Sequence, residues 1–236
     1  MNETCRALAL LLTYPDARLR ALLPQLAEFL AADRSLGAAA REGLAALIAG
    51  LLEGEPFEVE AAYVDCFDRG RSTSLLLFEH VHGDSRERGQ AMTDLLATYE
   101  SAGLQLAPGE LPDYLPAVLE FASTQPPKVA REFLGELSQI LNGLHSALVA
   151  RRSRYASVIA SVLELAGERV RHVALPPEEP IDEAWAEPPA FDGCSTRGQA
   201  RPDGAQPIHV VRKTPDAGAA RGAGSSAASL RQGALR

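Results

Sequence analysis

The stretch LLFEHVHGDSRERGQAM, Leu76–Met92, decides whether this chain is an enzyme with a metal site or a helical protein without one. Its two histidines, His80 and His82, are two positions apart, which is about 200° around a helix and places the rings on opposite faces. A zinc site needs three or four ligands that converge on one ion. The stretch therefore favours a structural function, and we expect no metal ion and no other cofactor in this protein.

The second half of the stretch has the residues of a joint between two helices. Gly83 is typical of the position that follows a helix end. Asp84 fits the N-cap of the next helix, and Glu87 follows it three positions later, which is a capping box in its Asp form. We therefore predict a helix-turn-helix corner made by Gly83, Asp84 and Glu87. The apolar run in front of it, Leu75–Phe78, is expected to be a helix through the middle of a bundle.

Apolar residues recur at helical spacing on both sides of this joint. The sets that share one predicted face are Leu44, Leu47, Ile48 and Leu51; Val59, Tyr63, Cys66 and Phe67; Met92, Leu95, Leu96 and Tyr99; Val129, Phe133, Leu137, Ile140, Leu144 and Leu148; and Tyr155, Val158, Ile159, Val162, Ala166 and Val170. Because each set forms one stripe on a helix, the fold class is all-α, a single helical-bundle domain of about eight to ten helices. Pro24 interrupts a further stripe and is expected to start a helix.

The composition of the chain changes near Leu175. Every long apolar stripe lies before this point, so we expect residues 1–175 to form the all-α domain. Residues 176–236 are rich in Pro, Gly, Ala, Ser and Arg, and such a composition buries too little apolar area to offset the entropy of ordering. We therefore predict that residues 176–236 are a low-complexity, mostly disordered tail.

Charge and hydropathy exclude several classes of partner. The chain has a net charge of -8, whereas a nucleic-acid-binding protein needs a basic face for phosphates. No apolar run reaches the roughly 20 residues that span a bilayer. The N-terminus lacks the basic start and small-residue cleavage site of a secretory signal. We expect a cytoplasmic protein with no nucleic-acid partner and no direct membrane insertion.

One acidic segment is a candidate binding surface. Tyr63 and Phe67 are one helical turn apart, and Asp65 and Asp68 stand beside them. An aromatic stripe bordered by carboxylates can form one wall of a groove for a basic amphipathic helix. The alternative interpretation is a solvated helix face with no binding function.

The sequence contains no arrangement of residues that predicts catalysis. It has no Gly-rich phosphate loop, no Gly-x-Ser-x-Gly turn and no evident Ser/His/Asp set. The segment GELPDYLPAVLEF, residues 109–121, begins like an ordinary helix, since the helix dipole favours Asp113 near an N-terminus. We therefore expect a protein that is not an enzyme.

The runs LLLFEHVHGDSRERGQAM, LLATYESAGLQL and ELPDYLPAVLEF together resemble the nitrate reductase delta subunit family of molybdenum-cofactor assembly chaperones. The segments YPD, near the N-terminus, and YVDCFDRGRSTSL fit the same family. The resemblance covers residues 5–175 and extends more weakly to the wider group of all-α chaperones for molybdoenzymes.

Two motifs of that wider group can be placed on this sequence. The aromatic-x-x-Leu-Phe motif falls on residues 63–67, where Cys66 stands in place of the usual Leu. The acidic-Pro-x-Asp-His motif falls on residues 110–114, where Leu111 follows the acid and Tyr114 stands in place of His. The resemblance therefore implies one set of client-peptide-binding residues: Tyr63, Asp65, Phe67, Asp68, Glu110, Asp113 and Tyr114.

The resemblance also implies a function and a partner. The family's chaperones bind the N-terminal segment of the apo catalytic subunit of respiratory nitrate reductase and enable molybdenum-cofactor and iron-sulfur insertion before the enzyme attaches to the membrane. Contact with molybdenum-cofactor biosynthesis proteins is a further implied possibility. Two alternatives stay open: a generic helical interaction scaffold, for which we find no internal repeat, and a metal-dependent enzyme built around His80 and His82.

Overall fold

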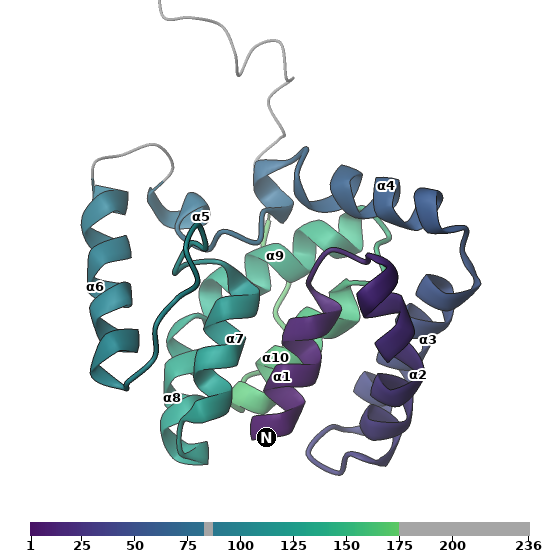
Figure 1. Ribbon diagram of the computed structural model, residues 1–236, viewed down its shortest axis with the longest axis horizontal. Coiled ribbons are helices and arrows are strands. Elements are labelled where there is room, and N and C mark those ends of the chain that lie inside the picture. The colour runs from purple at the N-terminus through teal and green to yellow at the C-terminus, as the bar shows by residue number, and fades with distance from the viewer. Residues whose placement is uncertain (83–86, 175–236) are drawn as a thin grey trace, which may run out of the picture. The chain divides into compact units, whose positions relative to one another are not determined.

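The computed structural model describes residues 1–82 and 87–174. These residues form ten α-helices and one short 3₁₀ helix, and they contain no strand (Figure 1). The all-α prediction with eight to ten helices is therefore confirmed. The elements are α1 Asn2–Leu11, α2 Ala17–Ala32, α3 Ala38–Glu53, α4 Pro56–Phe67, the 3₁₀ helix η1 Arg71–Thr73, α5 Glu79–His82, α6 Glu87–Ser101, α7 Leu115–Thr124, α8 Pro127–Glu136, α9 Ser138–Ala150 and α10 Ala156–Ala166.

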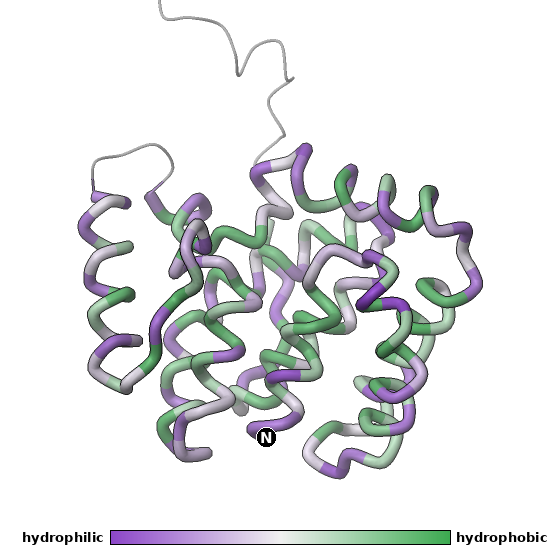
Figure 2. The backbone as a smooth tube through the Cα atoms, in the orientation of Figure 1, coloured by the Kyte–Doolittle hydropathy of each residue, from purple (hydrophilic) through white to green (hydrophobic). Residues whose placement is uncertain are grey.

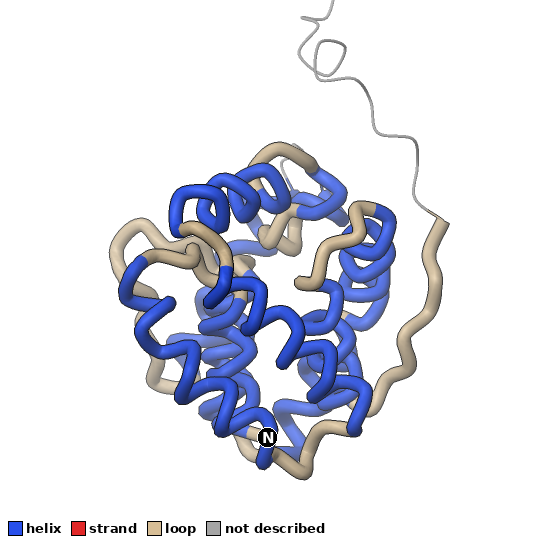
Figure 3. Tube along the Cα trace, turned by 90° about the vertical axis from the view of Figure 1, so that its right-hand side faces the viewer, coloured by secondary structure: helices blue, strands red, loops and turns tan. Residues whose placement is uncertain are grey.

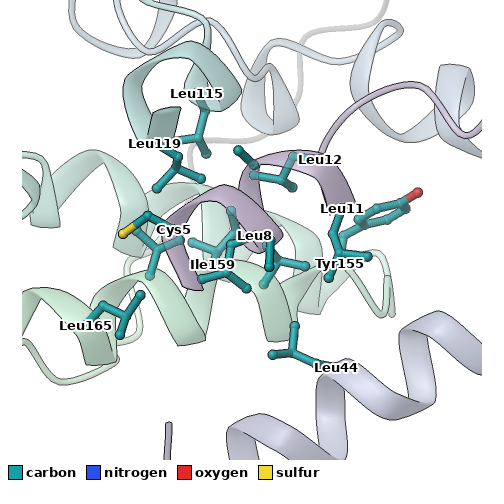
Figure 4. Packing of buried hydrophobic residues seen from close by; sticks show 14 of the residues in the cluster. Cys5, Leu8, Leu11, Leu12, Leu44, Leu115, Leu119, Tyr155, Ile159 and Leu165 are labelled. Atoms are coloured by element: carbon teal, nitrogen blue, oxygen red, sulfur yellow. The ribbon is translucent and has the colours of Figure 1, made fainter. Parts of the chain in front are cut away.

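The core is built around α1, which packs against α2, α7 and α10. Leu8, Leu11 and Leu12 are fully buried, and Figure 4 shows them among side chains of α7 and α10. Burial of each leucine stabilises the fold by about 1.5 to 3 kcal/mol relative to an exposed position. Figure 2 shows mainly hydrophobic residues along the central helices and a mixture of hydrophilic and hydrophobic residues along α6.

Most of the described chain is helical, and loops join the helix ends (Figure 3). The stripe predicted in α3 is confirmed, because Leu44, Leu47, Ile48 and Leu51 are its buried residues. In α6 only Tyr99 of the predicted stripe is buried. A stripe thus identifies a helix, but the neighbouring elements decide how much of it is covered.

The prediction of a helix at Leu75–Phe78 is wrong. The backbone here pairs with the segment before α7: the Leu77 amide donates to the Asp113 carbonyl at 3.0 Å, and the Leu115 amide donates to the Leu75 carbonyl at 2.9 Å. Leu76 and Tyr114 form an isolated antiparallel bridge. Four consecutive apolar residues are compatible with either a buried helix or a buried extended segment, so periodicity alone could not distinguish the two.

Pro24 lies inside α2 and does not start it, which corrects the second expectation. A proline in a helix interior removes one backbone hydrogen bond. The side chain of Pro24 is exposed, whereas Leu23 and Leu26 beside it are buried. Water can therefore reach the backbone on the side of the helix where the proline lies, and the helix starts instead at Ala17 behind the N-cap Asp16.

Two predicted stripes extend beyond the helices that carry them. The stripe from Val129 to Leu148 belongs to two helices, because α8 and α9 are separated at Leu137, whose near-helical φ of −85° leaves the spacing of the stripe almost unchanged. Helix α10 ends at Ala166, since Gly167 adopts a left-handed φ of 79°. Val170, predicted as part of that stripe, lies outside the helix and is 47% exposed.

The predicted joint is described only in part. Glu87 is the first residue of α6, and its carboxylate lies 3.8 Å from the Nδ1 atom of His82 in α5. Gly83 and Asp84 lie outside the described residues, as does the predicted tail, residues 176–236.

Candidate peptide-binding surface

A hollow of about 620 Å³ lies beside the C-terminal end of α4. Tyr63 and Phe67 of α4 form one side, and Leu76 and Tyr114 come from the two paired backbone segments. The complete lining is Tyr14, Tyr63, Phe67, Asp68, Arg69, Gly70, Arg71, Ser74, Leu75, Leu76, Glu79 and Tyr114. We refer to this set as the α4 hollow.

The floor of the α4 hollow is an aromatic cluster. Tyr63 and Phe67 are 5% and 4% exposed, with ring centroids 4.8 Å apart, and the Phe67 ring lies 4.9 Å from that of Tyr155. The Tyr63 hydroxyl donates to the Leu12 carbonyl at 2.7 Å. Burial raises the pKa of Tyr63 far above its ordinary value, so this hydroxyl keeps its proton and remains a donor.

Tyr14 is the accessible aromatic residue of the α4 hollow. It is 44% exposed, and its ring contacts that of Tyr63 edge-on at 5.6 Å. Its hydroxyl donates to the Glu60 carboxylate at 3.0 Å. The sequence analysis did not include Tyr14 in the binding set, although the segment YPD in which it lies was one of the signals of the resemblance.

The charged residues of the α4 hollow are mixed in sign. Asp68 and Glu79 supply carboxylates, and Arg69 and Arg71 supply guanidinium groups. Asp65 does not line the hollow; its exposed carboxylate pairs with Arg69 at 3.2 Å. The predicted aromatic stripe with an acidic border is thus present, but its acids are accompanied by bases.

A second hollow, of about 400 Å³, lies between α1, α7 and the segment that follows α6. Tyr99 and Phe121 are buried at its floor, with ring centroids 4.7 Å apart. Its charged lining residues are the acids Glu3, Glu110 and Glu120 and the base Arg6. Tyr114 lines both hollows, so an extended ligand could follow one path across its ring.

Asp113 does not have the position that was expected of a client-binding carboxylate. Its side chain is completely buried. The Oδ2 atom accepts a hydrogen bond from the Phe78 amide at 3.1 Å and lies 3.8 Å from Nη2 of Arg88 in α6. Burial raises the pKa of Asp113, and the Phe78 amide and the Arg88 guanidinium oppose that rise. Asp113 therefore holds the backbone of the segment 75–78, part of which lines the α4 hollow.

The structure brings together four of the seven predicted residues in the α4 hollow: Tyr63, Phe67, Asp68 and Tyr114. Glu110 joins Tyr114 in the second hollow, while Asp65 and Asp113 line neither. Glu79 was missed because the opening stretch was interpreted only as a joint. Its position directly before His80 gave no signal that it would line the α4 hollow.

His80 and His82 have separate partners. The Nε2 atom of His80 lies 2.8 Å from the Ser74 carbonyl, and the ring of His82 contacts that of Phe78 at 5.7 Å. Within residues 1–82 and 87–174, no three His, Cys, Asp or Glu side chains are grouped so that they could hold a metal ion. No helix in the same part of the chain is long and apolar enough to cross a membrane.

A family model described as "Nitrate reductase delta subunit" matches residues 14–159. The chain belongs to this family. The resemblance inferred from the sequence is thereby confirmed. The matched region begins at Tyr14 and contains every residue that lines the α4 hollow.

Relatives from two organisms agree with the family assignment. The chain is 46% identical over 160 residues to the nitrate reductase molybdenum cofactor assembly chaperone NarJ of Escherichia coli K12, covering 68% of each protein. It is 50% identical over 117 residues to the probable chaperone NarW of the same strain, covering 50% of this chain and 51% of the relative. It is 34% identical over 178 residues to the probable NarJ of Bacillus subtilis, covering 72% and 95%. The NarJ and NarW names describe assembly chaperones and not enzymes, which agrees with the prediction that this chain has no catalytic function.

Proposed function

We propose that this protein is a system-specific chaperone for respiratory nitrate reductase. It binds the N-terminal segment of the apo catalytic subunit and enables insertion of the molybdenum cofactor and the iron-sulfur clusters before the enzyme attaches to the membrane. The binding takes place in the cytoplasm, and molybdenum-cofactor biosynthesis proteins are further partners. The observation that carries the proposal is the 46% identity to a nitrate reductase assembly chaperone over 160 residues.

The two hollows support a helical peptide as the client. The aromatic floors formed by Tyr63 and Phe67 and by Tyr99 and Phe121 can accept the apolar face of such a peptide. Carboxylates at the rims, with Glu110 as an exposed example, can pair with its basic residues. Apolar contact supplies most of the affinity, because exposed ion pairs contribute only about 0 to 1 kcal/mol each.

The first test is calorimetric titration of the full-length protein with a synthetic peptide. The peptide carries the first residues of the catalytic subunit from the same genome, about 20 residues, which as a helix spans about 30 Å. Tyr14→Ala should weaken binding by on the order of 2 kcal/mol, since Tyr14 is the accessible aromatic residue of the α4 hollow.

A control is available at the other end of α4. Phe57 is 81% exposed at the start of α4 and does not line the α4 hollow. Phe57→Ala should therefore bind the peptide as the parent does. Equal losses for Tyr14→Ala and Phe57→Ala, with both variants folded, would place the peptide site elsewhere.

The electrostatic contribution is tested with salt and with single acids. Asp68→Asn and Glu110→Gln, each of which removes a carboxylate that lines a hollow, should each weaken binding by at most about fivefold, and high salt should reduce the affinity of the parent. An affinity that salt leaves unchanged would argue against a basic client face.

The assembly step needs a cellular test. In a strain that lacks its own chaperone, this protein should restore nitrate reductase activity and the molybdenum content of the purified enzyme. If this protein binds the peptide in calorimetry but does not restore the molybdenum content of the enzyme, its function is limited to binding the client.

A further inference from the structure

Arg88, in the first turn of α6, is shared between two carboxylates. Its Nη1 atom lies 3.5 Å from Oε1 of Glu79, and its Nη2 atom lies 3.8 Å from Oδ2 of Asp113. The side chains of Arg88 and Glu79 are 21% and 27% exposed, and that of Asp113 is completely buried. Both distances are longer than the roughly 2.7 to 2.9 Å of a good charge-assisted hydrogen bond. Arg88 is therefore held loosely between its two partners.

The pairing between Arg88 and Asp113 is incomplete. The Nε atom of Arg88 and the Oδ1 atom of Asp113 are both buried, and neither has a hydrogen-bond partner among the described residues. An unsatisfied buried donor or acceptor is costly. A side-on pair, in which Nε and Nη2 donate to the two oxygens of one carboxylate, would satisfy both atoms. In the described geometry the guanidinium reaches toward both carboxylates, with Nη1 toward Glu79 and Nη2 toward Asp113, and the side-on pair is not made.

Glu79 connects this cluster to the binding surface. It lines the α4 hollow together with Leu76 and Tyr114. A cationic side chain of a peptide in that hollow would thus find a carboxylate whose present partner, Arg88, is 3.5 Å away and makes a single contact. The Asp113 side chain keeps its position in either case, because its Oδ2 atom also accepts a hydrogen bond from the Phe78 amide.

Helix α6 is free enough to follow Arg88. Tyr99 is its one buried residue among those described, and the Tyr99 hydroxyl fixes the C-terminal half of the helix by donating to the Pro112 carbonyl at 2.8 Å. In the N-terminal half, Arg88 pairs with Glu79 and Asp113, Glu87 lies near His82, and the apolar side chain of Met92 is half-buried. A change of partner at Arg88 can therefore change the local stability of this half.

We propose that Arg88 is a positioning residue that changes partner when client binds: a lysine or arginine of the client takes Glu79, and Arg88 closes side-on onto Asp113. This inference rests on the proposed function, since the client supplies the cation. This change of partner makes the α4 hollow selective for a client that places a basic residue beside Glu79. It also links occupancy of the α4 hollow to the N-terminal half of α6.

Hydrogen exchange of the full-length protein tests the link. With the N-terminal client peptide bound, amides in residues 89–95 should exchange more slowly by about fivefold, because a better ion pair stabilises the first turns of α6. A matched peptide with its lysines and arginines replaced by glutamine should leave these amides unchanged even at saturating concentration.

Two variants separate this inference from the proposed function. Glu79→Gln removes the competing carboxylate, so the free variant, without any peptide, should already show the slower exchange in residues 89–95. Arg88→Lys keeps the charge but cannot form a side-on pair. It should bind the peptide within about threefold of the parent, since Arg88 itself does not contact the client, and should lose the exchange response.

Each outcome has a distinct meaning. Failure of the parent to bind the peptide, in calorimetry, counts against the proposed function alone. Unchanged exchange in free Glu79→Gln would overturn the switch of Arg88, whatever the peptide does. A normal exchange response in Arg88→Lys would show that α6 responds to client by another route and would equally overturn it.

Discussion

Helices α10 and α6 carry similar apolar stripes but have different environments. Seven of the 11 residues of α10 are buried, whereas one of the 15 residues of α6 is buried. Helix α10 packs against α1, α3, α8 and α9. Helix α6 lies against the short helix α5, and the ring of its Tyr99 packs on Phe121 of α7. The comparison teaches that apolar spacing indicates a helix, while the elements around it decide how strongly its stripe contributes to stability.

The same contrast separates stability from function. A helix enclosed on several sides, such as α10, cannot move without opening the core, because protein interiors are closely packed. A helix with one buried residue among its described side chains, such as α6, can shift at lower cost. We therefore expect global unfolding to depend on α10 and local opening to depend on α6.

The largest effect is expected in α10. Ile159→Ala should lower the free energy of unfolding by about 3 kcal/mol, since Ile159 is fully buried and the substitution leaves a cavity. Leu96→Ala in α6 is the matched control and should cost about 1 kcal/mol or less, because Leu96 is only half-buried. Urea denaturation followed by circular dichroism measures both. Equal losses would remove the distinction between the two helices.

A glycine in α3 tests how closely α10 is packed. A Cβ atom at Gly43 would lie 2.8 Å from Cβ of Ser157, at the start of α10. Gly43→Ala should therefore destabilise the protein by about 1 to 2 kcal/mol despite the better helix propensity of alanine. The denaturation midpoint is the readout, and a more stable variant would show that this contact can relax.

An intermediate effect is expected at the anchor of α6. Tyr99→Phe removes the hydrogen bond to the Pro112 carbonyl and should cost about 1 kcal/mol. The loss should appear as faster hydrogen exchange in the C-terminal half of α6, with little change in α10. Faster exchange in both helices would mean that α6 and α10 open together.

The smallest effect is expected at Gly89, near the start of α6. A Cβ atom there would meet no other atom within 4 Å. Gly89→Ala should stabilise the helix by about 0.5 kcal/mol, because alanine loses less conformational freedom than glycine. Exchange of the neighbouring amides measures the gain. A destabilised variant would indicate that α6 packs more closely than its exposed residues suggest.

The prediction from sequence succeeded where the signal is local. Helical spacing identified the helices that contain Leu44 and Tyr63, and the specific run around His82 identified the family. It failed where the signal depends on distant residues. The run Leu75–Phe78 is apolar in either conformation, and its pairing with residues 113–115 cannot be inferred from its own composition.

The candidate site shows the same division. Tyr63 and Phe67 were named because they share one helix face, and they do lie together at the floor of the α4 hollow. Tyr14 and Glu79 were not named, because no spacing relates them to α4. Asp113 was named because it matches a motif of the wider chaperone group, yet its carboxylate is completely buried and does not line the α4 hollow.

The amino-acid sequence by itself determined that this protein is all-α and that it belongs to the delta subunit family. These properties depend on the spacing of apolar residues and on short runs of residues, which are local features of the sequence. Only the tertiary structure decided which residues line the two hollows, that Tyr114 is common to both, and that Arg88 is shared by Glu79 and Asp113. Burial and ion pairing depend on distances between residues that are far apart in the chain, and the packing of the helices sets those distances.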